Sequence, residues 1–386
     1  MRRTAVVSAL LAAAFAVAAG SASGKVANGP SGLAFYKPPH LSGKAHGGLI
    51  WVRKLSKAAA LKPASANELV LYRSIGEDGK PIGVSGSIAI PRGKPPKGGW
   101  PVLTWAHGTT GIADQCAPTR DPQATTYTNA DLGAWLKAGF AVVRTDYQGL
   151  GTPGTHLYLV GQEEGRSVLD IVRAARQFDP RIGTRVFIGG HSQGGHAALW
   201  AAALASKWTP ELKVQATTAF APASHIEDQA KLLGQLQNNS PGITGLAALI
   251  FRGIDAAQPS LHLASLLSPQ AATLYAHTLT DCSLAPFVGS LTPADLFQKN
   301  VDLTPAYTAL GKSDPEHLKI KTPLFIAQGT DDTTVFPTFT DQLDQALSAS
   351  GSKIDYQHYA GVDHGGIVAA ATKDALAFAR AHLKRG

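Results

Sequence analysis

The segment 190–194, with the sequence Gly-His-Ser-Gln-Gly, constrains this chain more than any other. It matches the pattern G-x-S-x-G, follows an apolar run at 186–188 that predicts a buried strand, and precedes an Ala- and Leu-rich run with helical spacing. A strand that turns sharply into a helix strains its corner residue and needs small neighbours two positions before and after it, here Gly190 and Gly194. The segment therefore predicts a nucleophile elbow that holds the Ser192 hydroxyl above a sheet, beside the N–H groups of a helix. The alternative is a glycine-rich turn whose serine only caps that helix.

A serine nucleophile needs a base, and the base needs a carboxylate that orients it. On elbow folds both follow the serine in the chain, first the acid and then the histidine. Asp331 and Asp332 follow an apolar strand predicted at 323–327, and Asp332 is the favoured acid because it lies three residues after a glycine and three before a valine. The other aspartate would then be a turn or capping residue. His364, in a glycine-rich loop before the last predicted helix, is the predicted base.

Two N–H groups are expected to bind the negative charge that develops on the substrate oxygen. One is the backbone N–H of Gln193, directly after the serine, and the other belongs to the loop after an earlier strand, where Thr109 is favoured over Thr110. The alternative for that loop is a simple glycine-rich turn. His191 and His196, on either side of the serine, are expected to point away from it and to be structural.

Strands alternate with helices from about residue 100 onward, after two strands that suggest an antiparallel hairpin. This order predicts the α/β class, with a mostly parallel sheet covered by helices on both faces. The interval 226–317 contains helical runs and no convincing strand, which predicts a helical cap inserted between two core strands; the alternative is a helical subdomain at the sheet edge. The predicted organisation is an N-terminal arm at 24–64, a core at 65–225 and 318–386, and the cap at 226–317.

The N-terminus predicts export. Two arginines precede an uncharged apolar run at 5–19, and small residues suitable for cleavage follow it, which is typical of a secretory signal peptide at 1–23. The mature protein is thus expected to be soluble and secreted, to the extracellular space or the periplasm. In such a compartment two cysteines, Cys116 and Cys282, suggest one disulfide, although two separate buried thiols are the alternative.

Composition and motifs exclude several classes of function. The formal charge of +8 is mild and dispersed, which argues against a nucleic-acid partner. The segment 149–154 matches G-x-G-x-x-G, but Pro153 interrupts the expected helix start, so we reject a dinucleotide site. Zinc-binding and Walker motifs are absent, and the sequence predicts neither a cofactor nor a metal.

Taken together, several motifs resemble those of the secretory lipase family, the lipase A type of the α/β-hydrolases. They are the segments 105–111, 146–151, 191–195, 329–332 and 363–364. The residue before the serine is often Tyr in that family and is His191 here. The resemblance, which covers about 35–386, implies a capped α/β-hydrolase that cleaves carboxylic esters, including acylglycerols.

The predicted function is therefore that of a secreted serine esterase or lipase with the catalytic residues Ser192, His364 and Asp332. The alternatives are a serine peptidase or amidase on the same fold and a non-catalytic binding protein. The substrate is expected to be a small ester or lipid, and acylglycerols would bring transient contact with a lipid interface.

An acyl chain needs an apolar concave site that excludes water. Because the run 243–254 is apolar nearly all round, we expect the cap to cover Ser192 and to bind substrate with Leu246, Ile250 and Phe251. A Cys116–Cys282 disulfide would tie this cap to the loop that carries Thr109.

Overall fold

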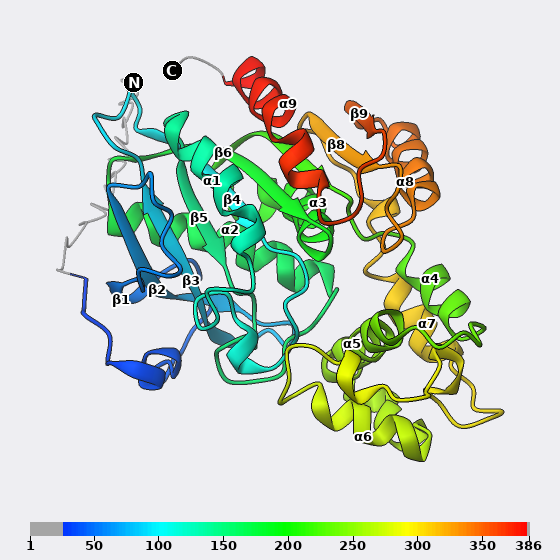
Figure 1. Cartoon of the computed structure of the whole chain (residues 1–386). Helices are drawn as coiled ribbons and strands as arrows, with labels where there is room; N and C mark the ends of the chain where they lie inside the picture. Colours follow the sequence, from blue (N-terminus) through cyan, green and yellow to red (C-terminus); the bar gives the residue numbers. More distant parts are fainter. Residues whose placement is uncertain (1–25, 384–386) are drawn as a thin grey trace, which may run out of the picture.

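The computed structural model describes residues 26–383, and within that range the chain forms one nine-stranded sheet (Figure 1). The strands lie in the order β1-β2-β3-β5-β4-β6-β7-β8-β9. Their bounds are β1 Leu49–Lys54, β2 Ala66–Ile75, β3 Pro81–Ile90, β4 Trp100–Ala106, β5 Ala141–Thr145, β6 Ile182–His191, β7 Lys213–Phe220, β8 Leu324–Gly329 and β9 Ile354–Tyr359. The first three strands pair antiparallel and β3 pairs antiparallel with β5, whereas all pairs from β5 to β9 are parallel.

Helices cover both faces of this sheet. Successive strand residues point to opposite sides, and both sets of side chains include apolar residues that pack against helices. On β4, for example, Val102 faces a core formed with α2 and α3, while Leu103 faces a core formed with α1 and α9. The α8 residues Leu343 and Leu347 join the first of these cores. The bounds of these helices are α1 Asn129–Lys137, α2 Gly161–Phe178, α3 Gln193–Trp208, α8 Pro337–Ala349 and α9 Ile367–His382. Both faces of the sheet are therefore buried, as predicted for this fold class.

The chain between β7 and β8 forms the cap, which lies beside the sheet (Figure 1). Apart from one isolated bridge between Leu267 and Phe297, its described residues contain helices and no strand. Its α-helices are α4 Ile226–Leu233, α5 Pro241–Ala257, α6 Pro269–His277 and α7 Thr304–Gly311. The cap has its own apolar core, which also includes Ile112, Tyr158 and Leu159 from loops of the main domain.

Short 3-10 helices connect several of these elements. They are η1 Gly32–Tyr36, η2 Asp114–Cys116, η3 Thr126–Thr128, η4 Pro259–Leu261, η5 Leu263–Leu266, η6 Ala285–Phe287, η7 Pro293–Asp295 and η8 Pro315–His317. The predicted signal peptide at 1–23 lies outside the described residues. Among the residues that the structure does describe, we find no helix with the length and apolar character of a membrane span.

A disulfide joins Cys116, at the end of η2, to Cys282 in the cap, with 5.4 Å between their Cα atoms. Cys116 is fully buried, and the bond spans 166 positions of sequence. The predicted disulfide is therefore present, and it holds the cap close to the loop that follows β4.

Candidate active site

Ser192 lies at the corner between β6 and α3 with a φ of 59° and a ψ of −121°, a conformation that is strained for any residue other than glycine. The two flanking glycines are required by close backbone approaches. A Cβ on Gly190 would lie 2.0 Å from the carbonyl oxygen of Gly194, and one on Gly194 would lie 2.0 Å from that of Ala106. The chain thus forms the sharp strand-to-helix turn that its sequence predicts.

Three side chains form one chain of hydrogen bonds across the sheet edge. The Nε2 atom of His364 lies 3.0 Å from the Ser192 Oγ, and its Nδ1 lies 2.7 Å from Oδ2 of Asp332. A carboxylate only accepts hydrogen bonds, so Nδ1 carries the proton and Nε2 is free to accept the proton of the serine hydroxyl. His364 comes from the loop between β9 and α9, and Asp332 follows β8. Asp331 is exposed, and its Oδ1 accepts a hydrogen bond from Thr330 at 3.0 Å instead.

Asp332 is buried and held by several donors. The backbone N–H groups of Thr334 and Val335 donate to its Oδ1 at 2.8 and 2.9 Å, and the Gln328 amide donates to its Oδ2 at 3.2 Å. Burial alone would raise the pKa of this carboxyl, but the hydrogen bond and charge of His364, together with the two backbone donors, lower the pKa below its usual value. The carboxylate is therefore ionised and fixed in direction beneath the imidazole.

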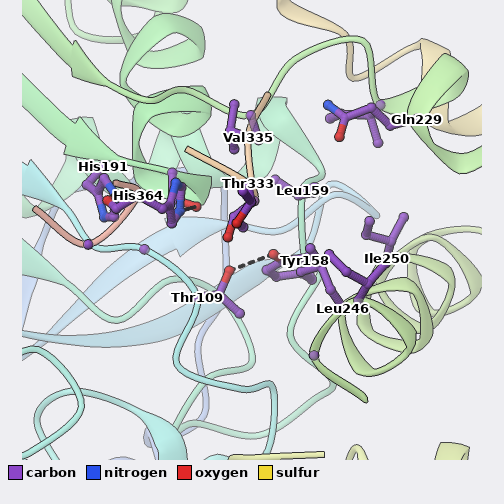
Figure 2. A pocket seen from close by; sticks show the side chains of 18 of the residues that line it. Thr109, Tyr158, Leu159, His191, Gln229, Leu246, Ile250, Thr333, Val335 and His364 are labelled. Carbon is purple, nitrogen blue, oxygen red and sulfur yellow. Dashed lines mark hydrogen bonds between the residues drawn. The ribbon is translucent and has the colours of Figure 1, made fainter. Parts of the chain in front are cut away.

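The predicted oxyanion donors come from two separate segments of the chain. Gln193 is the first residue of α3, so its N–H has no intrahelical partner. Thr109 lines the cavity at Ser192, and its Oγ1 lies 2.6 Å from the Tyr158 hydroxyl (Figure 2). Thr110 is not among the described residues that line this cavity.

The cavity above Ser192 and His364 has a volume of about 650 Å³ and extends under α4 and α5 of the cap. Leu246 and Ile250 point into it from α5, and Gln229 lies on the α4 side (Figure 2). None of the described residues that line it is Lys, Arg, Asp or Glu. Such a site accepts an uncharged, largely apolar ligand.

The prediction for Phe251 is wrong. Its side chain packs inside the cap, with its ring 4.7 Å from that of Phe297 in an edge-to-face contact, and it is buried there. On a helix, residues three, four and seven positions apart share a face, so Ile243, Leu246 and Ile250 line the cavity together. Phe251 is rotated about 100° from Ile250 and faces the cap core.

The expectation that His191 points away from the site is also wrong. Its Nε2–H donates to the backbone carbonyl of His364 at 2.9 Å, its Nδ1 accepts from the Tyr127 hydroxyl at 3.0 Å, and its ring lies 4.6 Å from that of His364. Burial and then the neighbouring His364 lower its pKa to about 3, so it stays neutral. The sequence signal is its position as the last residue of β6, next to the serine. His196, in contrast, has no place among the described cavity residues.

Comparison with known proteins places these observations in a family. The sequence model of a family described as "Secretory lipase" matches residues 119–383. Lipase A of Moesziomyces aphidis is 27% identical over 194 residues, which cover 47% of this chain and 40% of that protein. A probable inactive lipase of Mycobacterium tuberculosis is 26% identical over 216 residues, covering 52% of this chain and 45% of that protein. The chain thus spans less than half the length of these curated relatives.

Among solved structures, that of Candida antarctica lipase A is similar, with a TM-score of 0.73 and 21% identity over 83% of this chain and 78% of that chain. With the sheet order described above, this similarity confirms the predicted fold, a mostly parallel sheet between helices with an inserted helical cap.

Proposed function

Because the chain belongs to the secretory lipase family, we propose that it is an exported serine hydrolase that cleaves carboxylic esters, with acylglycerols as its main substrate class. The observation that carries the proposal is the hydrogen-bond chain Ser192–His364–Asp332, which opens into an uncharged and mostly apolar cavity beneath the cap. A nucleophile, a base and an orienting acid in this order are what acyl transfer requires.

In the first half of the reaction, Ser192 Oγ forms a bond to the ester carbonyl carbon while its proton moves to Nε2 of His364. The negative charge that develops on the carbonyl oxygen is stabilised by the N–H of Gln193 and by Thr109. The bond between this carbon and the alcohol oxygen then breaks, and His364 returns its proton to the departing alcohol. An acyl-serine remains.

In the second half, a water molecule attacks the acyl carbon and gives a proton to His364. The bond to Ser192 breaks, the proton returns to its Oγ, and the carboxylic acid leaves. Throughout, Asp332 stabilises the imidazolium form of His364 and holds its Nδ1 proton in place.

The uncharged cavity supports esters over the two alternatives. A peptidase that recognised a free amino group or a charged side chain would bind it best with an opposite charge, and no described residue of the cavity lining supplies a carboxylate or a fixed cation. A binding protein would have no use for a strained serine aligned with a histidine and an ionised aspartate.

Labelling the folded protein with a fluorophosphonate probe, followed by hydrolysis assays on p-nitrophenyl esters and aminoacyl anilides, tests this proposal. We expect an adduct on Ser192 and turnover of the esters, with Ser192→Ala as the unlabelled control. No adduct on the folded protein would favour the binding protein, and faster turnover of the anilides would favour the peptidase.

For localisation, we propose that the signal peptide at 1–23 is cleaved and that the rest of the chain is exported. The exported chain would consist of the N-terminal arm at 24–64, the core at 65–225 and 318–386, and the cap at 226–317. The Cys116–Cys282 disulfide supports an oxidising compartment. N-terminal sequencing of the exported protein is expected to begin near residue 24, and an exported chain that retains residues 1–23 would contradict cleavage.

A further inference from the structure

A buried polar network is hydrogen-bonded to the side chain of Gln193, the residue that directly follows Ser192. Its central group is the Glu164 carboxylate of α2, which is fully buried. Glu164 Oε1 accepts the Gln193 side-chain amide at 2.7 Å and the Leu159 backbone N–H at 3.0 Å, and its Oε2 accepts His196 Nδ1 at 2.9 Å. None of these contacts takes part in the triad, so the network needs a separate explanation.

The hydrogen-bond partners fix the orientation of the Gln193 side chain. His156 Nδ1 faces the Gln148 carbonyl at 3.0 Å and must donate to it, so His156 Nε2 is an acceptor. The Gln193 Nε2 atom lies 2.8 Å from this acceptor and 2.7 Å from the Glu164 carboxylate. Both amide hydrogens are therefore used, and a flipped amide would place its oxygen against two acceptors. Burial lowers the pKa of His156, which keeps Nε2 unprotonated.

The charge of Glu164 is also balanced inside the network. Both ring nitrogens of His196 face acceptors, Glu164 on one side and the Ser313 carbonyl at 2.8 Å on the other, so both carry protons and the ring is a cation. Burial lowers the pKa of His196, but the hydrogen bond and charge of Glu164, together with the Ser313 carbonyl and the charge of Asp314, raise the pKa above its usual value. The network is a paired, fully buried unit with no spare donor at its centre.

The same network reaches the other side of the predicted oxyanion hole. The His156 ring stacks on that of Tyr147 at 5.6 Å, and the Tyr147 hydroxyl donates to the His107 carbonyl at 2.9 Å, in the loop that carries Thr109. Leu159, bound by Glu164, directly follows Tyr158, whose hydroxyl contacts Thr109. Tyr147 and Leu159 have φ values of 69° and 58°, strained conformations that persist only where the surroundings impose them.

Resting on the hydrolase function above, we propose that the Gln193 side chain, Glu164 and His156 are positioning residues that hold both donors of the oxyanion hole, the Gln193 N–H and the Thr109 loop, in one geometry. Gln193 contributes in two ways, since its backbone faces the substrate oxygen while its side chain is anchored from below. The buried network sets the direction of that N–H before substrate arrives, so little reorganisation is needed in the transition state.

Gln193→Met tests this directly, because it keeps the backbone N–H and the side-chain length and removes only the two anchoring hydrogen bonds. We expect kcat per active site, counted by titration with an organophosphate, to fall about tenfold to a hundredfold with KM little changed, as for a small misplacement of a catalytic group. The inhibition constant of a trifluoromethyl ketone, which forms an oxyanion on Ser192, should rise by the same factor.

Ser167→Ala is the matched control. It removes another buried hydrogen bond of α2, from Ser167 Oγ to Glu163 at 2.7 Å, without contact to Gln193, and should lower thermal stability while leaving kcat unchanged. His156→Leu, which removes one acceptor of the Gln193 amide, decides the matter if Gln193→Met does not fold.

Normal kcat per active site in the Gln193→Met and His156→Leu proteins would overturn the inference, as would a fall in kcat with an unchanged ketone inhibition constant. Failure of the unaltered protein to react with fluorophosphonate would instead refute the hydrolase function itself, so the two failures are distinct.

Discussion

Asp332→Asn tests whether Asp332 or its neighbour Asp331 is the acid of the triad, because the substitution changes which ring nitrogen of His364 carries the proton. In the structure, Oδ1 accepts two backbone N–H groups, so the carbonyl oxygen of an asparagine would take that position and its NH₂ would face His364. The Nδ1 atom of His364 would then have to accept a hydrogen bond, and its proton would move to Nε2. At 3.0 Å from Ser192 Oγ, a protonated Nε2 cannot remove the proton of the hydroxyl.

The cost follows from the wrong tautomer. Loss of the correct tautomer lowers kcat by on the order of 10⁴-fold in a Ser-His-Asp triad, or about 5.5 kcal/mol of transition-state stabilisation at 1.36 kcal/mol for each factor of ten. Asp332 is not among the described residues that line the cavity, so KM should change little. The measurement is steady-state hydrolysis of a p-nitrophenyl ester, with circular dichroism to verify folding.

Asp331→Asn is the control, because this exposed residue contributes one hydrogen bond with Thr330 and none to His364. Its kcat should stay within about twofold of the unaltered protein, as is usual for a surface substitution. A loss of activity in Asp331→Asn with an active Asp332→Asn protein would refute the assignment of the acid. Near-normal kcat in both would refute the tautomer argument.

Three further outcomes follow from the structure. Ser192→Ala should lower kcat for ester hydrolysis by on the order of 10⁴-fold or more in a folded, exported protein. A variant protein that keeps its activity and still reacts with fluorophosphonate would point to another nucleophile. Replacing Cys116 and Cys282 by Ala opens a loop of 166 positions and should lower the free energy of unfolding in urea by about 5 kcal/mol in the chain-entropy model, whereas an unchanged midpoint would mean that the cap holds its place without the bond. Ile250→Trp should lower kcat/KM for long acyl chains more than for short ones, while Phe251→Leu, inside the cap core, should leave the preference for long over short chains unchanged. An equal loss of kcat/KM on all chain lengths would show that Ile250 does not contact the acyl chain.

The parts of the site that the sequence predicts are those fixed by local chain geometry. The turn at Ser192 needs glycines at set positions, and the ends of parallel strands bring Asp332 and His364 to one edge of the sheet because the chain order of this fold leaves few alternatives. The same applies to the alternation of strands and helices, since each strand buried on both faces leaves an apolar run in the sequence.

The residues that the sequence does not predict depend on helix rotation and on contacts between distant segments. The run 243–254 is apolar nearly all round, so its composition could not separate Ile250, which faces the cavity, from Phe251, which faces the cap core. Likewise Glu164 binds the Gln193 amide across 29 positions of sequence, and an acidic residue in the first turn of a helix is by itself typical of a solvated N-terminus.

The way the cap is attached explains why the cavity has a defined shape. The helix α5 packs closely on the main domain at Gly253, where a Cβ would lie 2.4 Å from the Tyr158 carbonyl oxygen, and Tyr158 contacts Thr109 through its hydroxyl. Lifting α5 would therefore break its packing on the segment that contacts Thr109, and the disulfide also ties the cap to the loop that follows β4. The apolar face of α5 is thus a fixed wall of the cavity, and if the proposed function holds, its side chains would select acyl groups by length. The segment 156–164 would then stabilise both the turn at Ser192 and the acyl site.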